Sequence, residues 1–367
     1  MREPPDLAGD LIVGALQAGF GIRVAGLAFL PVGNDADSWA YRVDTGDGPP
    51  RFLKVRSGAG AMPGASVAAY LQRRGTPRVL APLPTRAGEP YLAVDRFALA
   101  LYPMLDARTG AEAGLLAAQW RELGAAVAEV HATPPAPALL RLVGREAFRP
   151  SRRELLPELE AALAAAGPAD PAAGRMAASW QARRDVIEAL AERADRLGRE
   201  LAGSPAARVL CHGDLHTWNV LVDSAGALWI ADWDEAVVAP RERDLMFVVG
   251  GIGHGLVSPA ATASFLEGYG EVTVDPALLA YYRCAWAVQD IAAYGEQALL
   301  SPAAGDADRR AAVEGFEQLF APGNIVDLAR GSPSGRRRRG TSTPALVRPA
   351  SRQPPGHTGL GSPGMPS

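Results

Sequence analysis

The sequence is poor in cysteine and has no long apolar run. Two cysteines, Cys211 and Cys284, stand among 367 residues, too few for a disulfide framework. Cys211 ends a short apolar run and is expected to be a small buried residue. No segment approaches a transmembrane helix, and the acidic, proline-containing amino terminus MREPPDLAGDL does not fit a secretory signal. These absences predict a cytoplasmic protein without a membrane partner.

Lysine is almost absent as well, because Lys54 is the single lysine among 37 basic residues. The dipeptide Gly-Lys therefore occurs nowhere, which excludes a Walker P-loop. Gly359, Gly361 and Gly364 fit the pattern G-x-G-x-x-G, but no strand is expected before them and no helix after them. Neither glycine-rich signature thus supports nucleotide binding.

The composition is that of a globular protein with room for two lobes. Hydrophobic residues make up 48% of the chain, and the mean hydropathy is +0.00. The net charge is −3, but residues 331–367 hold six arginines and no acid, so the rest of the chain is more acidic than this value. An acidic body disfavours nucleic acid as a partner and favours a cationic small-molecule substrate.

The stretch from His212 to Asp244 carries polar residues at a spacing that suits phosphoryl transfer. Asp214 and Asn219 lie five positions apart, and Asp232 follows thirteen positions after Asn219. A hairpin between them would bring Asp232 back toward Asn219. The hairpin is expected from two short apolar strands and the turn that joins them: 220–222, 228–231 and 223–226.

These three side chains match what a nucleoside triphosphate demands of a protein. The reaction needs a base near the accepting hydroxyl group and hard oxygen ligands for Mg²⁺. Asp214 suits the base, and Asn219 and Asp232 suit the metal, in the order of a kinase catalytic loop and its metal-binding strand end. The alternative is that Asp214 and Asp232 are turn carboxylates and Asn219 caps a strand end, but it leaves the combined match of residue types and spacing unexplained. The stretch therefore predicts phosphoryl transfer.

Lys54 supplies the nucleotide end of the predicted site. It stands in a short apolar strand, where kinases place the lysine that reaches the α- and β-phosphates. The phosphate-covering loop is expected at Gly33 and Asn34, with Asp35 as either part of it or a turn residue. Kinases pair the strand lysine with a glutamate on the next helix, but Gly64 stands in that place, which leaves open another carboxylate, a shifted register or a weak enzyme.

HGDLHTWN, DWDEA and ERDL together resemble the aminoglycoside phosphotransferase family of small-molecule kinases, and most closely its spectinomycin phosphotransferase branch. Supporting matches over most of residues 20–300 are FLKVRSG, LYPML, QWRELG and YYRCAWAVQDIAAYGEQ. The resemblance implies an α+β, bilobal protein-kinase-like fold with a small antiparallel sheet and a large helical lobe. It also implies ATP, with GTP possible, Mg²⁺ held by Asn219 and Asp232, and O-phosphorylation of a small hydroxylated substrate.

The same resemblance gives supporting residues their roles. Asp244 is expected to brace the catalytic loop, while His212 and His216 are expected to orient Asp214, the catalytic aspartate. Met104 is expected beside the nucleotide, at the hinge between the lobes. An aminocyclitol would require carboxylates and aromatic walls. The residues expected to contact it are Asp234, Glu235, Trp286, Asp290 and Tyr294.

The chain divides into three parts by pattern. Residues 1–104 are expected to form the nucleotide-binding lobe, 105–325 the catalytic and substrate-binding lobe, and 326–367 a disordered tail rich in Pro, Gly, Ser and Arg. A first helix is expected with Asp6 as its cap, with Leu7, Leu11, Ile12 and Leu16 near one face, and with Gly19 and Gly21 together as its stop. The expected strands are 24–30, 39–43, 51–55, 91–94 and 98–101, with a helix over 66–74.

Several functions remain open at this stage. A protein kinase is disfavoured, because only ten positions separate Asp234 from Asp244 and no APE sequence follows. The leading expectation is an antibiotic phosphotransferase, with spectinomycin or a related aminocyclitol as substrate. A metabolic kinase for another hydroxylated molecule and a nucleotide-binding pseudokinase are the alternatives. A metal-dependent hydrolase built on His212, Asp214 and His216 would leave the lysine strand unexplained.

Overall fold

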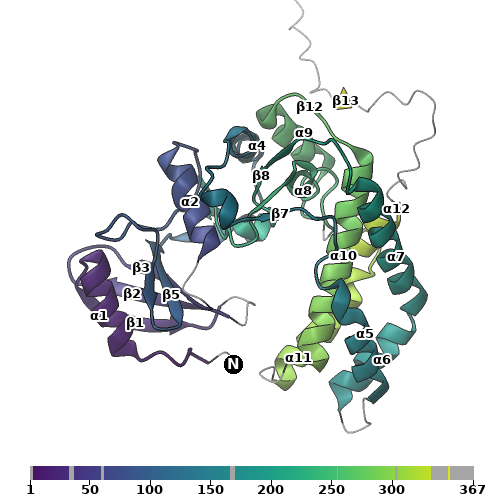
Figure 1. The fold of residues 1–367 in the computed structure, drawn as a ribbon, viewed down its shortest axis with the longest axis horizontal. Helices are drawn as coiled ribbons and strands as arrows, with labels where there is room; N and C mark the ends of the chain where they lie inside the picture. Colours follow the sequence, from purple (N-terminus) through teal and green to yellow (C-terminus); the bar gives the residue numbers. More distant parts are fainter. Residues whose placement is uncertain are drawn as a thin grey trace, which may run out of the picture.

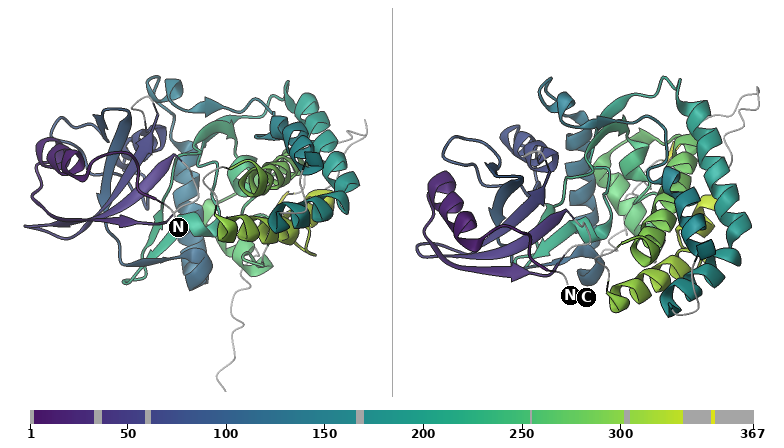
Figure 2. Two further views of the ribbon diagram at one scale, coloured as in Figure 1. Left: turned by 90° about the horizontal axis from the view of Figure 1, so that it is seen from below. Right: turned by 60° about the horizontal axis from the view of Figure 1, so that its bottom comes forward.

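The computed structural model describes residues 3–32, 37–58, 62–165, 170–253, 255–301, 305–331 and 346–347. They form a small lobe built on one sheet and a large, mainly helical lobe, which lie side by side in Figures 1 and 2. The α+β class predicted from the sequence is confirmed. None of the described helices is long and apolar enough to cross a membrane.

The small lobe is a five-stranded sheet in the order β1-β2-β3-β5-β4, and all of its neighbouring strands are antiparallel. Alternating burial along β3 turns Leu53 and Val55 into the lobe's core, so Lys54 points to the opposite face. The five strands are β1 (Val24–Leu30), β2 (Ser38–Thr45), β3 (Arg51–Ser57), β4 (Leu92–Val94) and β5 (Phe97–Pro103). Each of the five predicted strands is therefore confirmed, with ends that differ by up to two residues.

The first helix, α1 (Gly9–Phe20), covers one face of this sheet and ends at Gly21, which has a left-handed backbone. Two details of its prediction are wrong. Asp6 does not cap the helix, because the cap position is Ala8 and the Asp6 carboxylate pairs with Arg96 instead. Leu11 does not join the buried face and is 57% exposed, because its side chain lies more than a quarter of a turn around the helix from Ile12 and further from Leu16.

The second helix, α2 (Pro63–Arg73), lies between the two lobes. Ala65 packs with Ala98 and Ala100 of β5, whereas Val67 and Leu71 belong to the core of the large lobe. Pro63 begins the helix three residues before the predicted start. A proline is tolerated there, because the backbone amide of the first helical residue has no hydrogen-bond partner within the helix. The helix thus shares its two faces between the sheet and the large lobe.

The large lobe is organised around one long central helix, α10 (Pro276–Leu299), which packs against α7, α11 and α12. The other described helices are α3 (Gly110–Ala113), α4 (Ala117–Ala132), α5 (Leu156–Ala165), α6 (Pro171–Gln181), α7 (Arg184–Leu201), α8 (Glu242–Leu245), α9 (Pro259–Tyr269), α11 (Asp306–Leu319) and α12 (Ile325–Gly331). Three short 3₁₀ helices are η1 (Leu139–Arg141), η2 (Arg153–Leu155) and η3 (Thr217–Asn219).

Small sheets carry the catalytic stretch across the large lobe. The predicted hairpin is confirmed, because β9 (Val220–Asp223) pairs antiparallel with β10 (Leu228–Ile230) and β6 (Ala107–Thr109) completes that sheet. A second sheet has the order β7-β11-β8, with bounds Gly144–Arg145, Val237–Pro240 and Arg208–Cys211. A last pair joins β12 (Val272–Thr273) to β13 (Leu346–Val347).

The end of the large lobe lies further along the chain than predicted. Helix α12 buries Ile325, Val326 and Ala329 against α10, so the expected tail boundary at 326 falls inside a packed helix. The predicted boundary lies too early because the basic, proline-rich composition of the following segment outweighed the apolar spacing of this short helix. Both cysteines are buried and free, as expected for Cys211.

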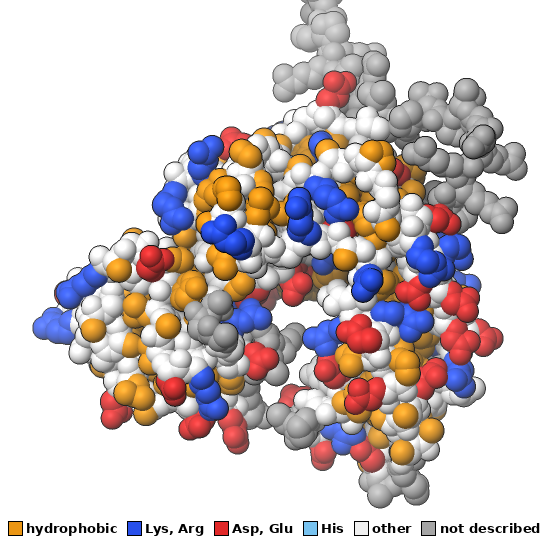
Figure 3. Space-filling view, viewed as in Figure 1, with side chains coloured by type: hydrophobic (Ala, Val, Ile, Leu, Met, Phe, Trp, Pro, Cys, Tyr) orange, Lys and Arg blue, Asp and Glu red, His pale blue; other side chains and the backbone are white. Residues whose placement is uncertain are grey.

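The lobes also meet through backbone pairing. Leu80 donates its amide to the carbonyl of Ile230 at 2.9 Å, and Ile230 donates to Arg78 at 2.6 Å. The segment after α2 is thereby fixed to the strand that leads to Asp232. Elsewhere the molecule is hollowed between the lobes, with acidic and basic side chains on the border of the hollow (Figure 3).

Candidate active site

The catalytic loop follows strand β8 and ends in the single turn η3. Asn219 donates its amide Nδ2 to both the backbone carbonyl and the Oδ2 of Asp214, each at 2.8 Å. These two bonds close the five-residue spacing into a compact turn, and they leave the amide oxygen of Asn219 as the atom suited to a metal. The structure therefore brings Asp214 and Asn219 together as the sequence predicts.

His216 flanks the other oxygen of Asp214, with Nε2 at 3.2 Å from Oδ1. Burial raises the pKa of the Asp214 carboxyl, but the hydrogen bond and charge of His216 outweigh it, so the pKa lies below its usual value. For His216, burial lowers the pKa, and the neighbouring Asp214 raises it above the ordinary value. The pair thus favours an ionised carboxylate beside a charged imidazole.

Asp244 binds the backbone at the start of the loop through its carboxylate. Its carboxylate accepts the backbone amides of His212 and Gly213, each at 2.8 Å, and lies 3.0 Å from Nε2 of His131. The Nδ1 of His131 is in turn 2.7 Å from the hydroxyl of Tyr269. Burial acts to raise the pKa of Asp244, but His131 and these donors lower it overall. Asp244 therefore lies where a bracing residue is expected.

His131 and Tyr269 are members of this chain of hydrogen bonds that sequence reasoning missed. His131 stands near the end of α4, and 113 positions separate it from Asp244. No local spacing connects the two, since only the packing of α4 against α9 and the catalytic loop brings them together. A histidine at the end of an apolar helix was the single sequence signal available.

His212 connects the loop to the metal-side strand. Its Nδ1 accepts the backbone amide of Asp214 at 3.2 Å, and its Nε2 lies 2.9 Å from the carbonyl of Ala231. Because a carbonyl can only accept, Nε2 carries the proton and the ring is the neutral tautomer that also accepts at Nδ1. Both nitrogens are used by the backbone, which argues against His212 as a metal ligand of a hydrolase.

Lys54 meets two acids at the junction of the lobes. Its Nζ lies 2.8 Å from Asp232 Oδ1 and 2.7 Å from Asp234 Oδ2, and Nη1 of Arg56 lies 2.5 Å from the same Asp234 oxygen. Burial acts to lower the pKa of Lys54, but Asp232 and Asp234 raise it above the ordinary value. Asp232 has a left-handed backbone, with φ of 57°, two residues after the end of β10. Asp232 thus closes on the site from the end of the predicted hairpin.

The expected substrate contacts are scattered over different environments. Asp234 is engaged by Lys54 and Arg56, and Glu235 is exposed nearby. Trp286 is buried, and its ring packs edge-on against Phe247 of the large-lobe core. Tyr294 lies against α11, where a Cβ on Gly315 would come within 2.4 Å of its ring. Asp234, Trp286 and Tyr294 therefore each contact other parts of the protein.

Asp290 is the candidate whose charge is influenced by that of Asp214. Burial, and then the negative charge of Asp214, raise the pKa of Asp290 to about 7. A carboxyl group at this position becomes ionised more readily when a cation binds beside it. The charge of Asp290 would therefore respond to a cation bound beside it.

The remaining predicted residues belong to the expected nucleotide end of the site. Gly33, Asn34 and Asp35, expected to cover the phosphates, fall outside the described residues. Met104 follows the end of β5 and is half-buried in the link to the large lobe. Met104 therefore lies where the small lobe connects to the large lobe.

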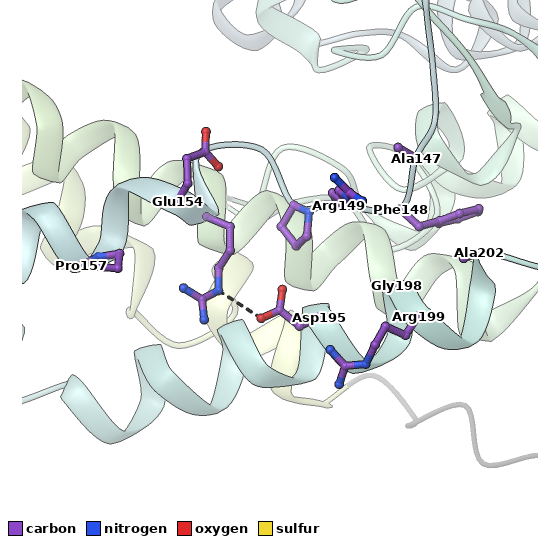
Figure 4. A pocket seen from close by; sticks show the side chains of 11 residues that line it. Ala147, Phe148, Arg149, Glu154, Pro157, Asp195, Gly198, Arg199 and Ala202 are labelled. Carbon is purple, nitrogen blue, oxygen red and sulfur yellow. Dashed lines mark hydrogen bonds and ion pairs between the residues drawn. The ribbon is translucent and has the colours of Figure 1, made fainter.

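A hollow of about 550 Å³ on the large lobe is a separate feature (Figure 4). None of the residues that line it belongs to the predicted site. Asp195, on its wall, accepts a hydrogen bond of 3.2 Å from Arg153 (dashed in Figure 4). This ion pair lies between elements of the helical lobe alone, η2 and α7.

Residues 28–299 match the model of the phosphotransferase enzyme family. The chain belongs to this family. Protein StrN of Streptomyces griseus is 33% identical to it over 298 residues, which are 78% of this chain and 83% of StrN. The phosphotransferase is therefore a small-molecule kinase that transfers phosphate to a hydroxyl group, as the sequence resemblance implies.

Solved structures confirm the kinase-like fold of this phosphotransferase. A spectinomycin phosphotransferase, APH(9)-Ia, in complex with ADP and spectinomycin superposes with a TM-score of 0.80 at 28% identity, covering 89% of this chain and 99% of that one. An amicoumacin kinase in complex with AMP-PNP, Ca²⁺ and its ligand shares the fold at 18% identity, with a TM-score of 0.57 and coverage of 88% and 97%. Both of these proteins were solved with a nucleotide bound.

Proposed function

We propose that this phosphotransferase uses ATP and Mg²⁺ to phosphorylate a small, cationic, hydroxylated molecule, an aminocyclitol antibiotic such as spectinomycin. The observation that carries this proposal is the compact group of Asp214, Asn219 and Asp232 facing Lys54 across the two lobes. The 28% identity to an enzyme complexed with ADP and spectinomycin supports the choice of substrate. Asp290, a second carboxyl group beside Asp214, supports a positive charge on that substrate.

In the proposed reaction, Asp214 accepts the proton of the acceptor hydroxyl group while the hydroxyl oxygen attacks the γ-phosphorus of ATP. The new bond joins that oxygen to phosphorus, and the bond between the γ-phosphorus and the bridging oxygen of ADP breaks. Asn219 and His216 hold the two carboxylate oxygens of Asp214 in place. Their contacts keep the carboxylate ionised and therefore able to receive the proton.

The metal-binding part of the proposal rests on the chemistry of the donors. Asp232 is a carboxylate with 52% of its side chain exposed, and Asn219 offers an amide oxygen, which are ligands that Mg²⁺ prefers. These two residues would hold the ion. When bound, Mg²⁺ neutralises charge that develops on the phosphate oxygens. Lys54 would hold the remaining phosphate charge from the side of the sheet.

A panel of acceptors tests the proposal. Aminocyclitols, aminoglycosides and amino alcohols are offered with Mg²⁺ and ATP, then with GTP, and ADP or GDP release is measured. Spectinomycin or a close aminocyclitol is expected to have the highest kcat/KM, and phosphate should be found on one of its hydroxyl groups. A preference for an amino alcohol would indicate a metabolic kinase instead. Tight binding of MgATP without turnover on any acceptor would indicate a pseudokinase.

A further inference from the structure

Helix α2 carries no acidic residue, although kinases use a glutamate on this helix to hold the strand lysine. Gly64, in the first turn of α2, lies against a different carboxylate. A Cβ built on Gly64 would come within 2.3 Å of Asp234 Oδ1. The helix therefore approaches the loop after β10 directly, at the place where a glutamate side chain would have filled the space.

Asp234 makes the contacts that the missing glutamate would make. Its Oδ2 accepts Lys54 Nζ at 2.7 Å and Arg56 Nη1 at 2.5 Å. Lys54 and Arg56 are two positions apart on β3, so they extend from the same face of the sheet. One carboxylate thus ties both cations of the strand to the large lobe.

The two acids that meet Lys54 differ in exposure. The Asp232 side chain is 52% exposed, whereas that of Asp234 is 17% exposed. An exposed carboxylate can turn to a metal ion, while one enclosed between β3 and α2 keeps its protein partners. If Asp232 turns to Mg²⁺, Asp234 still holds the Lys54 ammonium group in place.

Gly64 is the condition for this arrangement. Besides the Asp234 carboxylate, a Cβ at position 64 would lie 2.8 Å from the backbone nitrogen of Asp234 and 2.8 Å from the carbonyl carbon of Trp233. Backbone atoms cannot rotate away as a side-chain end can, and Trp233 is itself buried in the core. Any side chain at position 64 would therefore push α2 away from Asp234 or displace Asp234 from Lys54.

We infer that Asp234 is the positioning residue of Lys54, in place of the usual helix glutamate, and that Gly64 is required to let α2 close over it. This inference rests on the proposed function only in taking Lys54 as the contact to the phosphates of ATP. Gly64 then serves to let α2 approach Asp234 closely, and Asp234 explains how a kinase can position its strand lysine without an acidic residue on α2.

A double-mutant cycle tests the inference. The variants Lys54→Met, Asp234→Asn and the double variant are assayed for kcat/KM of ATP with spectinomycin as acceptor, or by basal ADP release if no acceptor is found. Each single change is expected to lower kcat/KM by about tenfold or more, and the double variant to be within about twofold of Lys54→Met, because Asp234 acts through Lys54. Asp195→Asn, which removes a carboxylate from the ion pair with Arg153, is the control and should match the unmodified protein.

The outcomes separate the inference from the proposed function. Loss of the Asp234 charge alone would strengthen the attraction between the two cations and the phosphates, so a purely electrostatic effect would raise kcat/KM. A rise, no change, or a loss that multiplies with that of Lys54→Met would overturn the inference. If Lys54→Met itself has no effect, the assignment of Lys54 to the nucleotide fails instead. Thermal unfolding of each variant checks that the fold is kept.

A second pair of variants tests the role of the glycine. Gly64→Ala is expected to lower kcat/KM of ATP to the same extent as Asp234→Asn and to add little in that background. Gly14→Ala in α1 is the matched control, because a Cβ there would meet nothing within 4 Å. Activity of Gly64→Ala equal to that of Gly14→Ala would contradict the requirement for glycine.

Discussion

His216 Nε2 and Asp214 Oδ1 lie 3.2 Å apart, on the side of the carboxylate opposite to the Asn219 amide. This contact lowers the pKa of Asp214 against the effect of burial. In His216→Phe, the pKa of Asp214 should therefore rise, and the acid limb of the kcat/KM profile should move to higher pH. Rates measured across the pH range would show this shift. An acid limb at the same pH in both proteins would mean that His216 does not control the charge of Asp214.

Asp214→Asn should lower turnover by roughly 10²- to 10⁴-fold, because the acceptor hydroxyl group loses its base. The amide has nearly the same shape, so Asn219 and His216 keep a partner and the fold should persist. Release of ADP measures turnover, and calorimetric titration with MgATP measures binding. Turnover equal to that of the unmodified protein would remove Asp214 from the reaction.

Asp232→Asn should change the dependence on Mg²⁺ more than the affinity for the acceptor. Replacing the proposed metal carboxylate is expected to raise the Mg²⁺ concentration at half-maximal rate by at least about tenfold. The measurement is a Mg²⁺ titration of ADP release at a fixed ATP concentration. Asp223→Asn on the neighbouring strand β9 is the control, and its Mg²⁺ curve should not move. Superimposable curves for all three proteins would contradict the metal assignment.

Asp244→Ala should destabilise the fold, because it removes the acceptor of two backbone amides and leaves His131 without its carboxylate. The expected loss is roughly 3 to 5 kcal/mol of unfolding free energy at pH 7, measured by urea denaturation. The pKa of Asp244 is lower in the folded state than in the unfolded chain. The ionised carboxylate therefore stabilises the fold at pH values above the unfolded-state pKa, and this stabilisation is lost as the pH falls through the folded-state pKa. A loss below about 1 kcal/mol, as for an exposed pair, would contradict this.

Asp290→Asn should stabilise the protein, and more so at higher pH. The pKa of Asp290 is raised from 3.8 to about 7, so the folded state holds a proton that the unfolded state releases. Its ionisation therefore costs stability as pH rises from about 4 to 7, and the cost is constant above that range. The melting temperatures of variant and unmodified protein should agree near pH 4 and differ most near pH 8. A difference that shrinks as pH rises would contradict the sign.

The sequence predicts those parts of the site that are neighbours along the chain. Asp214, Asn219 and Asp232 are connected by one hairpin, so their spacing and the turn between the strands were enough to bring them together. Lys54 could be found through its strand and through its being the single lysine. The five strands of the small lobe were predicted from alternation and turn residues, because each is short and bounded by Gly, Asp or Pro.

Contacts between distant segments were beyond the reach of the sequence. His131 meets Asp244 through helix packing, and no periodic pattern reports which helices cross. Asp234 was expected to face a substrate, whereas its carboxylate pairs with Lys54 and Arg56. The sequence could not predict this, because it does not show how closely α2 approaches Asp234 at Gly64. Asp6 failed as a helix cap for a related reason, since Arg96 competes for its carboxylate from another part of the fold.

Helix α2 belongs to the small lobe by its place in the chain, but its Val67 and Leu71 are embedded in the core of the large lobe. Its contact with the sheet is made instead by Ala65 against Ala98 and Ala100, whose short side chains interlock little. Helix α2 is therefore anchored more firmly to the large lobe than to the sheet. If the sheet tilts when a nucleotide enters or leaves, α2 would stay with the large lobe, and the pairs of Lys54 and Arg56 with Asp234 would be the contacts that limit the tilt.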